Sequence, residues 1–167
     1  MRAPVQVRFE RLQKLIDRVY DEAEKGGVIV VEGPRDKESL RLMGIKGRIL
    51  CLQSSRKNTI GFAEQLEGES HVVVLTDFDR EGVFLANRLA RILNSQKIHA
   101  NLTLWRELRG LTRSELRSIE ELPKLYQRLQ AEVYFHRPTG PELRHHSQVH
   151  ASSERFGHRS NHIDQPV

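Results

Sequence analysis

The sequence VVVLTDFDREG, residues 72–82, decides the fold that we predict for this chain of 167 residues. Its first four residues form a short apolar run that is rich in β-branched side chains, and acids follow before the glycine. Two similar runs lie upstream, at residues 28–31 and 49–52. Short runs that are apolar on both faces are typical of buried parallel strands.

Helical segments alternate with these runs. We predict helices over 34–43, 59–66 and 82–94, and an amphipathic helix over 8–25 that covers one side of the sheet and ends at Gly26-Gly27. Residues 97–104 alternate strictly between polar and apolar, which predicts a strand with one exposed face. Strand and helix in alternation indicate an α/β fold, with a mainly parallel central sheet of about four strands, right-handed crossovers and helices on both faces.

A further helical stretch is predicted from Thr112, where Thr-Arg-Ser-Glu has the form of a capping box and Leu111 can pack against Leu116. Pro123 is expected to break or kink it. Its predicted packing face consists of Leu116, Ile119, Leu122, Leu125 and Leu129. From about residue 136 the periodicity stops, and six of the eight histidines occur there, which indicates a mobile tail. Within that tail, incidental metal affinity is favoured over a designed zinc site, the candidates being His145, His146 and His150.

The size and composition predict one compact domain. We divide it into an N-terminal helix (1–26), a core (27–110), a C-terminal helical extension (111–135) and a disordered, histidine-rich tail (136–167). The chain has neither an apolar stretch long enough to cross a bilayer nor a secretory signal, so we expect it in the cytoplasm without membrane contact. Its lone Cys51 is expected to be a buried structural thiol. The net charge of +5 is compatible with a polyanionic partner but does not establish one.

Acidic side chains follow two of the buried strands. Glu32 comes directly after the first strand, and Asp77, Asp79 and Glu81 come after the third. Ligands bind beyond the carboxyl ends of parallel strands in such folds. Residues two apart in an extended segment project to the same side, so Asp77 and Asp79 can reach a common point. If the first and third strands are neighbours, Glu32 faces them.

Carboxylates this close repel one another unless a cation neutralises them. Hard oxygen ligands without histidine or cysteine favour Mg²⁺, so we expect Glu32, Asp77 and Asp79 to hold this ion, with Mn²⁺ as a substitute. Such an ion stabilises the charge that develops during transfer at phosphorus, and Glu32 can move a proton for the attacking or leaving oxygen. The simpler alternative is that each acid only caps a helix, and for a single acid that interpretation is the better one. The combination with the alternating strands favours a site.

These motifs resemble the Toprim domain, which type IA and type II topoisomerases, DnaG-type primases, OLD-family nucleases and the nuclease that matures 5S ribosomal RNA share. The resemblance rests on Val30-Val31-Glu32-Gly33 and Asp77-Phe78-Asp79, and it covers about residues 27–104. It implies that Glu32 is a general acid or base and that Asp77 and Asp79 bind magnesium. Glu81 occupies the place of a third acid in type IA topoisomerases, which implies a further ligand.

The chain also departs from the topoisomerases, because it has no room for a strand-cleaving domain or a gate. Its small size and the segment 105–111 look more like the 5S maturation nuclease and the small stand-alone Toprim proteins of archaea. We therefore expect a magnesium-dependent nuclease that acts on RNA or DNA with water as the nucleophile. The alternatives are a non-catalytic nucleic-acid-binding subunit of a larger assembly and, third, a primase-like nucleotidyl transferase. The oligomeric state is left open.

Basic residues near these motifs are candidates for holding phosphate groups. The candidates are Arg35, Lys37, Arg56, Lys57, Arg80 and Arg106. For any one of them, ordinary surface solvation is an equally good interpretation. Arg109 is a weaker candidate of the same kind, and Trp105 beside it is expected to be a packing residue.

Overall fold

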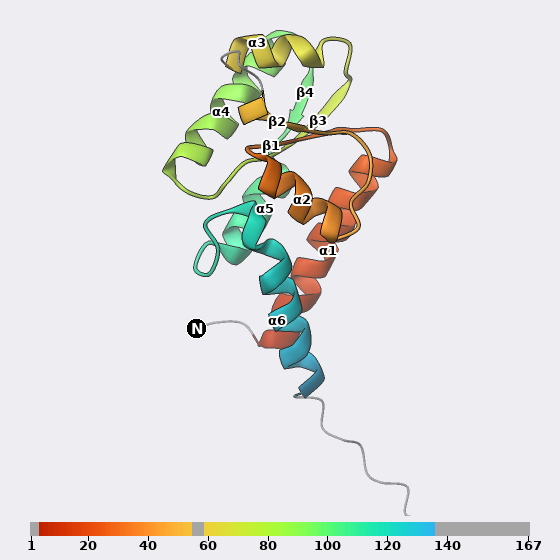
Figure 1. Ribbon diagram of the computed structural model, residues 1–167, viewed down its shortest axis with the longest axis vertical. Helices are drawn as coiled ribbons and strands as arrows, with labels where there is room; N and C mark the ends of the chain where they lie inside the picture. Colours follow the sequence, from red (N-terminus) through yellow and green to blue (C-terminus); the bar gives the residue numbers. More distant parts are fainter. Residues whose placement is uncertain (1–3, 55–58, 136–167) are drawn as a thin grey trace, which may run out of the picture. The chain divides into compact units, whose positions relative to one another are not determined.

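A computed structural model describes residues 4–54 and 59–135 of the chain. Its centre is a sheet of four parallel strands in the order β2-β1-β3-β4 (Figure 1). The strands are β1 (Val28–Val31), β2 (Ile49–Cys51), β3 (His71–Leu75) and β4 (His99–Asn101). The predicted α/β fold with a parallel sheet of four strands is therefore confirmed. The neighbouring positions of β1 and β3, on which the candidate site depends, are also confirmed.

β1 and residues 72–75 of β3 are fully apolar because both faces of these central strands are covered. Every residue of β1 and residues 72–75 of β3 have at most 1% of their surface exposed. The edge strand β4 is short and partly exposed, as an edge position allows. Cys51, at the end of β2, is a free, buried thiol as predicted.

Helices cover the two faces of the sheet. Figure 1 shows α3 and α4 on one side and α1, α2 and α5 on the other, and α6 packs along α1. The helices are α1 (Val5–Glu24), α2 (Pro34–Leu42), α3 (Thr59–Ala63), α4 (Arg80–Ser95), α5 (Thr103–Thr112) and α6 (Leu122–Phe135). Three short 3₁₀ turns accompany them: η1 (Leu52–Ser54), η2 (Glu64–Leu66) and η3 (Ile119–Glu121).

The predicted strand over 97–104 is wrong in its second half. β4 ends at Asn101, and α5 begins at Thr103, whose backbone N–H donates to Oδ1 of Asn101 at 2.8 Å. The buried residues of α5 include Leu104, Trp105 and Leu108, which follow helical spacing. A few alternating residues before a helix fit both periods, so the pattern could not separate the two elements.

The predicted helix start at Thr112 is also wrong. Thr112 is the last residue of α5, and its hydroxyl donates to the backbone oxygen of Leu108 at 2.8 Å. The capping box lies instead at Ser118 and Glu121, and it opens η3. Pro123 then sits in the first turn of α6, where its missing N–H has no helical partner to lose, so it does not break the helix.

The predicted packing face of the C-terminal helical segment is confirmed. All five of its residues are buried: Leu116, Ile119, Leu122, Leu125 and Leu129. Phe9 of α1 packs on Tyr126 of α6, with ring centroids 5.2 Å apart. The tail from residue 136, with its histidines, lies outside the described residues. Within the part of the chain that the structure describes, no helix is both long and apolar enough to cross a membrane.

Candidate functional site

The candidate site lies at the carboxyl ends of the two central strands. β1 and β3 run parallel with Val31 opposite Leu75, so the residues that follow them emerge side by side. Glu32 follows β1, and Asp77 follows β3 after Thr76. The fold thus brings together two acidic motifs that are more than forty residues apart in the sequence.

Glu32 lies between two cavities. One, of about 460 Å³, is also lined by Asp36, Asp77 and Glu120, and the other, of about 230 Å³, by Gln53 and Glu81. Burial raises the pKa of Glu32, a hydrogen bond from the Asp77 backbone lowers it, and the charges of Asp79, Glu81 and Asp36 raise it. Oε2 of Glu32 is buried and has no hydrogen-bond partner among the described residues.

Asp77 is half-buried and shares the larger cavity with Glu32. Burial raises its pKa to about 7, a hydrogen bond from the Ile119 backbone lowers it, and the nearby carboxylates raise it. The bond from Ile119 N to Oδ1 of Asp77 measures 3.0 Å. The other carboxylate oxygen of Asp77 accepts no hydrogen bond from the described residues.

Asp79 forms the N-cap of α4, because its Oδ1 accepts from the backbone N–H of Gly82 at 2.8 Å. The simple capping interpretation is therefore correct for one oxygen of this residue. Asp79 and Glu81 are both exposed. Their charges act on the pKa of Glu32, so the structure brings all four predicted acids into one electrostatic cluster.

Gly82 fixes the approach of α4 to the Asp77 backbone. A Cβ at this position would lie 2.2 Å from the carbonyl oxygen of Asp77, which no side chain can do without a shift of the main chain. The hydroxyl of Thr76, which is fully buried, donates to the Gly82 carbonyl oxygen at 2.8 Å. The glycine that ends the acidic motif is thus a requirement of the tight turn.

Asp36 is a site residue that sequence reasoning missed. It is 5% exposed, lines the larger cavity and accepts from the backbone N–H of Gly33 through Oδ2 at 2.8 Å. Burial raises its pKa, and its charge contributes to the raised pKa of Asp77. The signal in the sequence was the position of an acid three residues after the N-cap Gly33.

α5 holds the backbone of the acidic turn, which carries Asp77 and Asp79. Nε1 of Trp105 donates to the carbonyl oxygen of Thr76 at 2.9 Å, and Nε of Arg109 donates to that of Phe78 at 3.3 Å. The Arg109 guanidinium also lies 5.7 Å from the centre of the Trp105 ring. Trp105 is a buried packing residue, as predicted, and Nε of Arg109 is bonded to the backbone of the acidic turn.

The predicted basic residues do not all gather around the acids. Arg35 lines the larger cavity and lies 4.0 Å from Glu120 with its side chain 85% exposed. Lys37 is half-buried on α2, and Arg80 is exposed at the start of α4. Arg106 lines a separate hollow with Asn101 and Thr103. Arg56 and Lys57 lie outside the described residues.

The acids fit a hydrated cation better than a closed metal cage. Among the described residues, no group of three His, Cys, Asp or Glu side chains is arranged to hold a metal by itself. Burial and the neighbouring acids raise the pKa values of Glu32 and Asp77, and no cationic side chain of the described residues offsets this effect. Mg²⁺ commonly keeps several waters and uses one or two carboxylates together with substrate phosphates, so this donor set suits it.

The fold and the acidic motifs together define a Toprim-type domain. The Toprim domain family matches residues 26–103 of the chain. A solved structure from Aquifex aeolicus is 25% identical, has a TM-score of 0.55 and covers 65% of this chain and 95% of its own. Toprim domains generally bind Mg²⁺ through acidic residues and function with nucleic acids.

The relatives are small archaeal proteins. The UPF0292 protein of Thermococcus onnurineus is 35% identical over 118 residues, which cover 71% of this chain and 85% of that protein. The UPF0292 protein PF1724 of Pyrococcus furiosus is 36% identical over 121 residues, covering 72% and 88%. The chain belongs to the UPF0292 family of small Toprim-domain proteins. The predicted resemblance to stand-alone archaeal Toprim proteins is thereby confirmed.

Proposed function

We propose that this protein hydrolyses phosphodiester bonds in nucleic acid with Mg²⁺, or with Mn²⁺ as a substitute. The observation that carries the proposal is the meeting of Glu32 and Asp77 in one cavity, each with a raised pKa. Such values are expected where carboxylates are kept ready to take up a cation or a proton. Water serves as the nucleophile.

Each acid has a distinct part in this proposal. Asp77 and Asp79 would hold Mg²⁺, with Glu81 as a further ligand, since backbone hydrogen bonds occupy only one oxygen of each aspartate. The ion, when bound, supplies positive charge to non-bridging phosphate oxygens. As water attacks phosphorus and the bond to the leaving oxygen breaks, Glu32 takes up the proton of the attacking water or gives one to the leaving oxygen.

The remaining residues position the reacting groups. Asp36 holds the turn after Glu32 through Gly33 and adds negative charge to the cavity. Arg35, largely exposed at the cavity edge, binds a substrate phosphate, and the exposed Arg80 beside the acids can do the same. Lys37 remains a weaker candidate on the same helix.

A second function is a non-catalytic one, in which the domain binds nucleic acid within a larger assembly. The exposed cations Arg35 and Arg80 near the acids would serve such binding without any chemical step. The two functions differ in whether product forms, so one experiment separates them.

The experiment incubates the purified protein with labelled RNA and DNA, single-stranded and double-stranded, with Mg²⁺ or with EDTA. We expect cleavage that needs Mg²⁺ and that falls by a factor of roughly 100 or more in Glu32→Gln, as for loss of a general acid or base. Asp77→Asn should abolish it. Glu67→Gln, at an exposed position away from both cavities, is the matched control.

Three results would contradict the proposed nuclease. Cleavage that persists in both site variants indicates a contaminating enzyme. Binding without product in the wild-type protein, unchanged by either substitution, supports the non-catalytic subunit. Synthesis of primers from nucleotides would support the primase-like alternative instead.

A further inference from the structure

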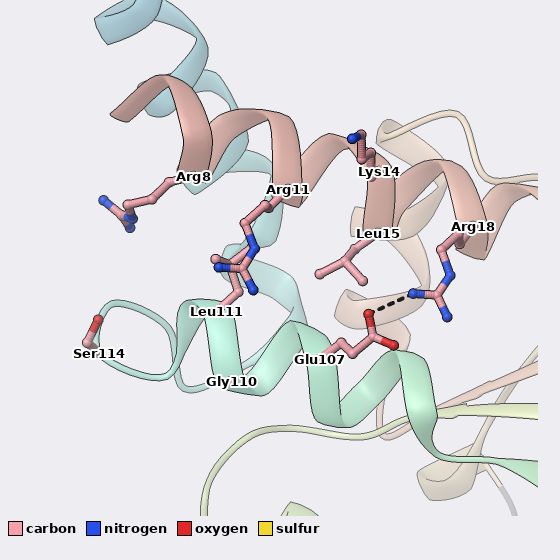
Figure 2. A pocket seen from close by; sticks show the side chains of 9 residues that line it. All are labelled: Arg8, Arg11, Lys14, Leu15, Arg18, Glu107, Gly110, Leu111 and Ser114. Atoms are coloured by element: carbon pink, nitrogen blue, oxygen red, sulfur yellow. Dashed lines mark hydrogen bonds and ion pairs between the residues drawn. The ribbon is translucent and has the colours of Figure 1, made fainter. Parts of the chain in front are cut away.

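A groove separates α1 from α5 on the face of the sheet that these helices cover. Its volume is about 690 Å³, and Figure 2 shows the side chains that line it. α1 lines it with Arg8, Arg11, Lys14, Leu15 and Arg18, and α5 with the turn after it adds Glu107, Gly110, Leu111 and Ser114. None of these residues lines the two cavities beside Glu32, so the groove is a separate feature.

The cations of the groove recur on one face of α1. They occupy positions 8, 11, 14 and 18, which places one on each successive turn over roughly 15 Å of helix. Arg8 pairs with Glu115 at 2.6 Å, and Arg18 pairs with Glu107 at 2.7 Å. Arg11 and Lys14 have no ion pair or hydrogen bond with any described residue. The groove therefore carries surplus positive charge between two neutralised ends.

The two unpaired cations differ in direction. Figure 2 shows the Arg11 guanidinium pointing across the groove toward α5, close to Leu111, whereas Lys14 extends away from α5 at the rim. Leu15 and Leu111 give the groove an apolar floor. A charged donor over an apolar floor suits a ligand with an anionic group joined to a less polar part.

Gly110 keeps this groove open. It lies in the last turn of α5, where glycine is less favourable than alanine. Its φ is not positive, and a Cβ built there meets no atom within 4 Å, so neither backbone conformation nor packing requires a glycine. The space above Gly110 is instead part of the groove opposite Arg11.

α5 connects the groove to the acidic site. One face carries Glu107, Gly110 and Leu111, while Trp105 and Arg109 hold the backbone of the Asp77–Asp79 turn through Thr76 and Phe78. A strand bound in the groove would lie on the helix that positions the acids.

We propose that the α1–α5 groove binds the sugar-phosphate backbone of a nucleic acid, with Arg11 as the main phosphate ligand and Lys14 as a second one. The apolar floor contacts the sugars, and Gly110 leaves room for the chain. The cations recur regularly along the groove, and the chain contains a Toprim domain. Both observations favour a nucleic acid over an acidic protein segment. This inference rests on the proposed function only in taking the bound strand to be the substrate.

The test measures binding of fluorescein-labelled hairpin RNA and its DNA counterpart by fluorescence anisotropy in EDTA, with the full chain. Gly110→Glu should raise Kd at least about tenfold, because it inserts a carboxylate where the backbone passes. Gly110→Ala, which adds only an uncharged methyl group to the groove, should raise Kd by a smaller factor than Gly110→Glu. Arg11→Ala should raise Kd and reduce the slope of log Kd against log salt by about 0.7 to 0.9, the loss of one phosphate contact.

A charge-matched pair of double variants controls for general electrostatics. Arg11→Ala with Lys14→Ala removes two groove cations, and Lys25→Ala with Lys46→Ala removes two exposed cations outside it. Only the first pair should weaken binding strongly. Thermal melting of each variant confirms that it folds, and a variant that does not fold is replaced by Arg11→Ala alone.

The outcomes separate this inference from the nuclease proposal. If the groove variants lose binding in EDTA while the wild-type protein cleaves nothing, the groove proposal is supported and the nuclease proposal is rejected. If Gly110→Glu cleaves nucleic acid with an unchanged KM, the groove proposal is rejected and the nuclease proposal is supported. Wild-type protein that binds no nucleic acid, or that polyglutamate displaces as readily as RNA at equal charge, also overturns the groove proposal.

Discussion

Burial and neighbouring carboxylates hold the pKa of Asp77 at about 7, far above its ordinary value of 3.8. Between pH 3.8 and pH 7, therefore, Asp77 keeps its proton in the folded protein but has lost it in the unfolded chain. Stability falls as pH rises through this window, and the loss is complete above pH 7. Glu32 and Asp36 act in the same direction, because their pKa values are raised as well.

Asp77→Asn should remove much of this pH dependence. The amide keeps an oxygen that accepts from Ile119 but carries no charge, so the variant should be more stable than the wild-type protein at pH 8 without metal. Urea denaturation in EDTA at pH 5 and pH 8 measures the difference. An equal loss of stability in both proteins between these pH values would show that Asp77 does not carry it.

Gly82 is constrained by its contact with the Asp77 carbonyl oxygen. Gly82→Ala should lower the free energy of unfolding by about 1–3 kcal/mol, since the Cβ overlaps backbone that cannot rotate away. Gly110→Ala is the matched control in another helix, where open space should make alanine stabilising by about 0.5–1 kcal/mol. Chemical denaturation compares them, and the same sign for both would contradict the packing argument.

Among the elements, α5 holds the backbone of the acidic turn through side-chain hydrogen bonds. Trp105→Phe removes the donor to the Thr76 carbonyl oxygen, a group of a fully buried residue. An unsatisfied buried acceptor costs about 1–3 kcal/mol, so we expect a loss of stability of about 2 kcal/mol. Phe78→Leu, which changes the same aromatic contact without a hydrogen bond, should cost less. Equal losses by urea denaturation would assign the effect to packing alone.

For the whole molecule, Mg²⁺ should stabilise the folded state, because the unfolded chain does not bring the acids together. At a concentration 100 times Kd the gain is about 2.7 kcal/mol. The ion competes with protons for carboxylates of raised pKa, so the gain should be larger at pH 8 than at pH 5. Thermal melting with Mg²⁺ and with EDTA measures it. A gain that persists in Asp77→Asn would place the ion elsewhere.

The sequence was informative where local pattern and burial agree. Residues 28–31 and 72–75 are apolar throughout because parallel central strands are covered on both faces, and that composition is legible without a structure. Because these strands are parallel neighbours, the acids that follow them lie at the same edge of the sheet. The start of α5 was missed, because residues 97–104 fit both a strand and the approach to a helix until tertiary packing buries Leu104 and Trp105.

The sequence by itself determined the α/β class, the strand that precedes each acidic motif and the identity of the acids. Only the tertiary structure decided that Asp36 shares their cavity, that burial raises the pKa of Asp77, and that α1 and α5 leave a groove with unpaired cations. The physical reason is that periodicity records which face of an element is buried, whereas burial of a polar group and the partner of a charge depend on segments far away along the chain.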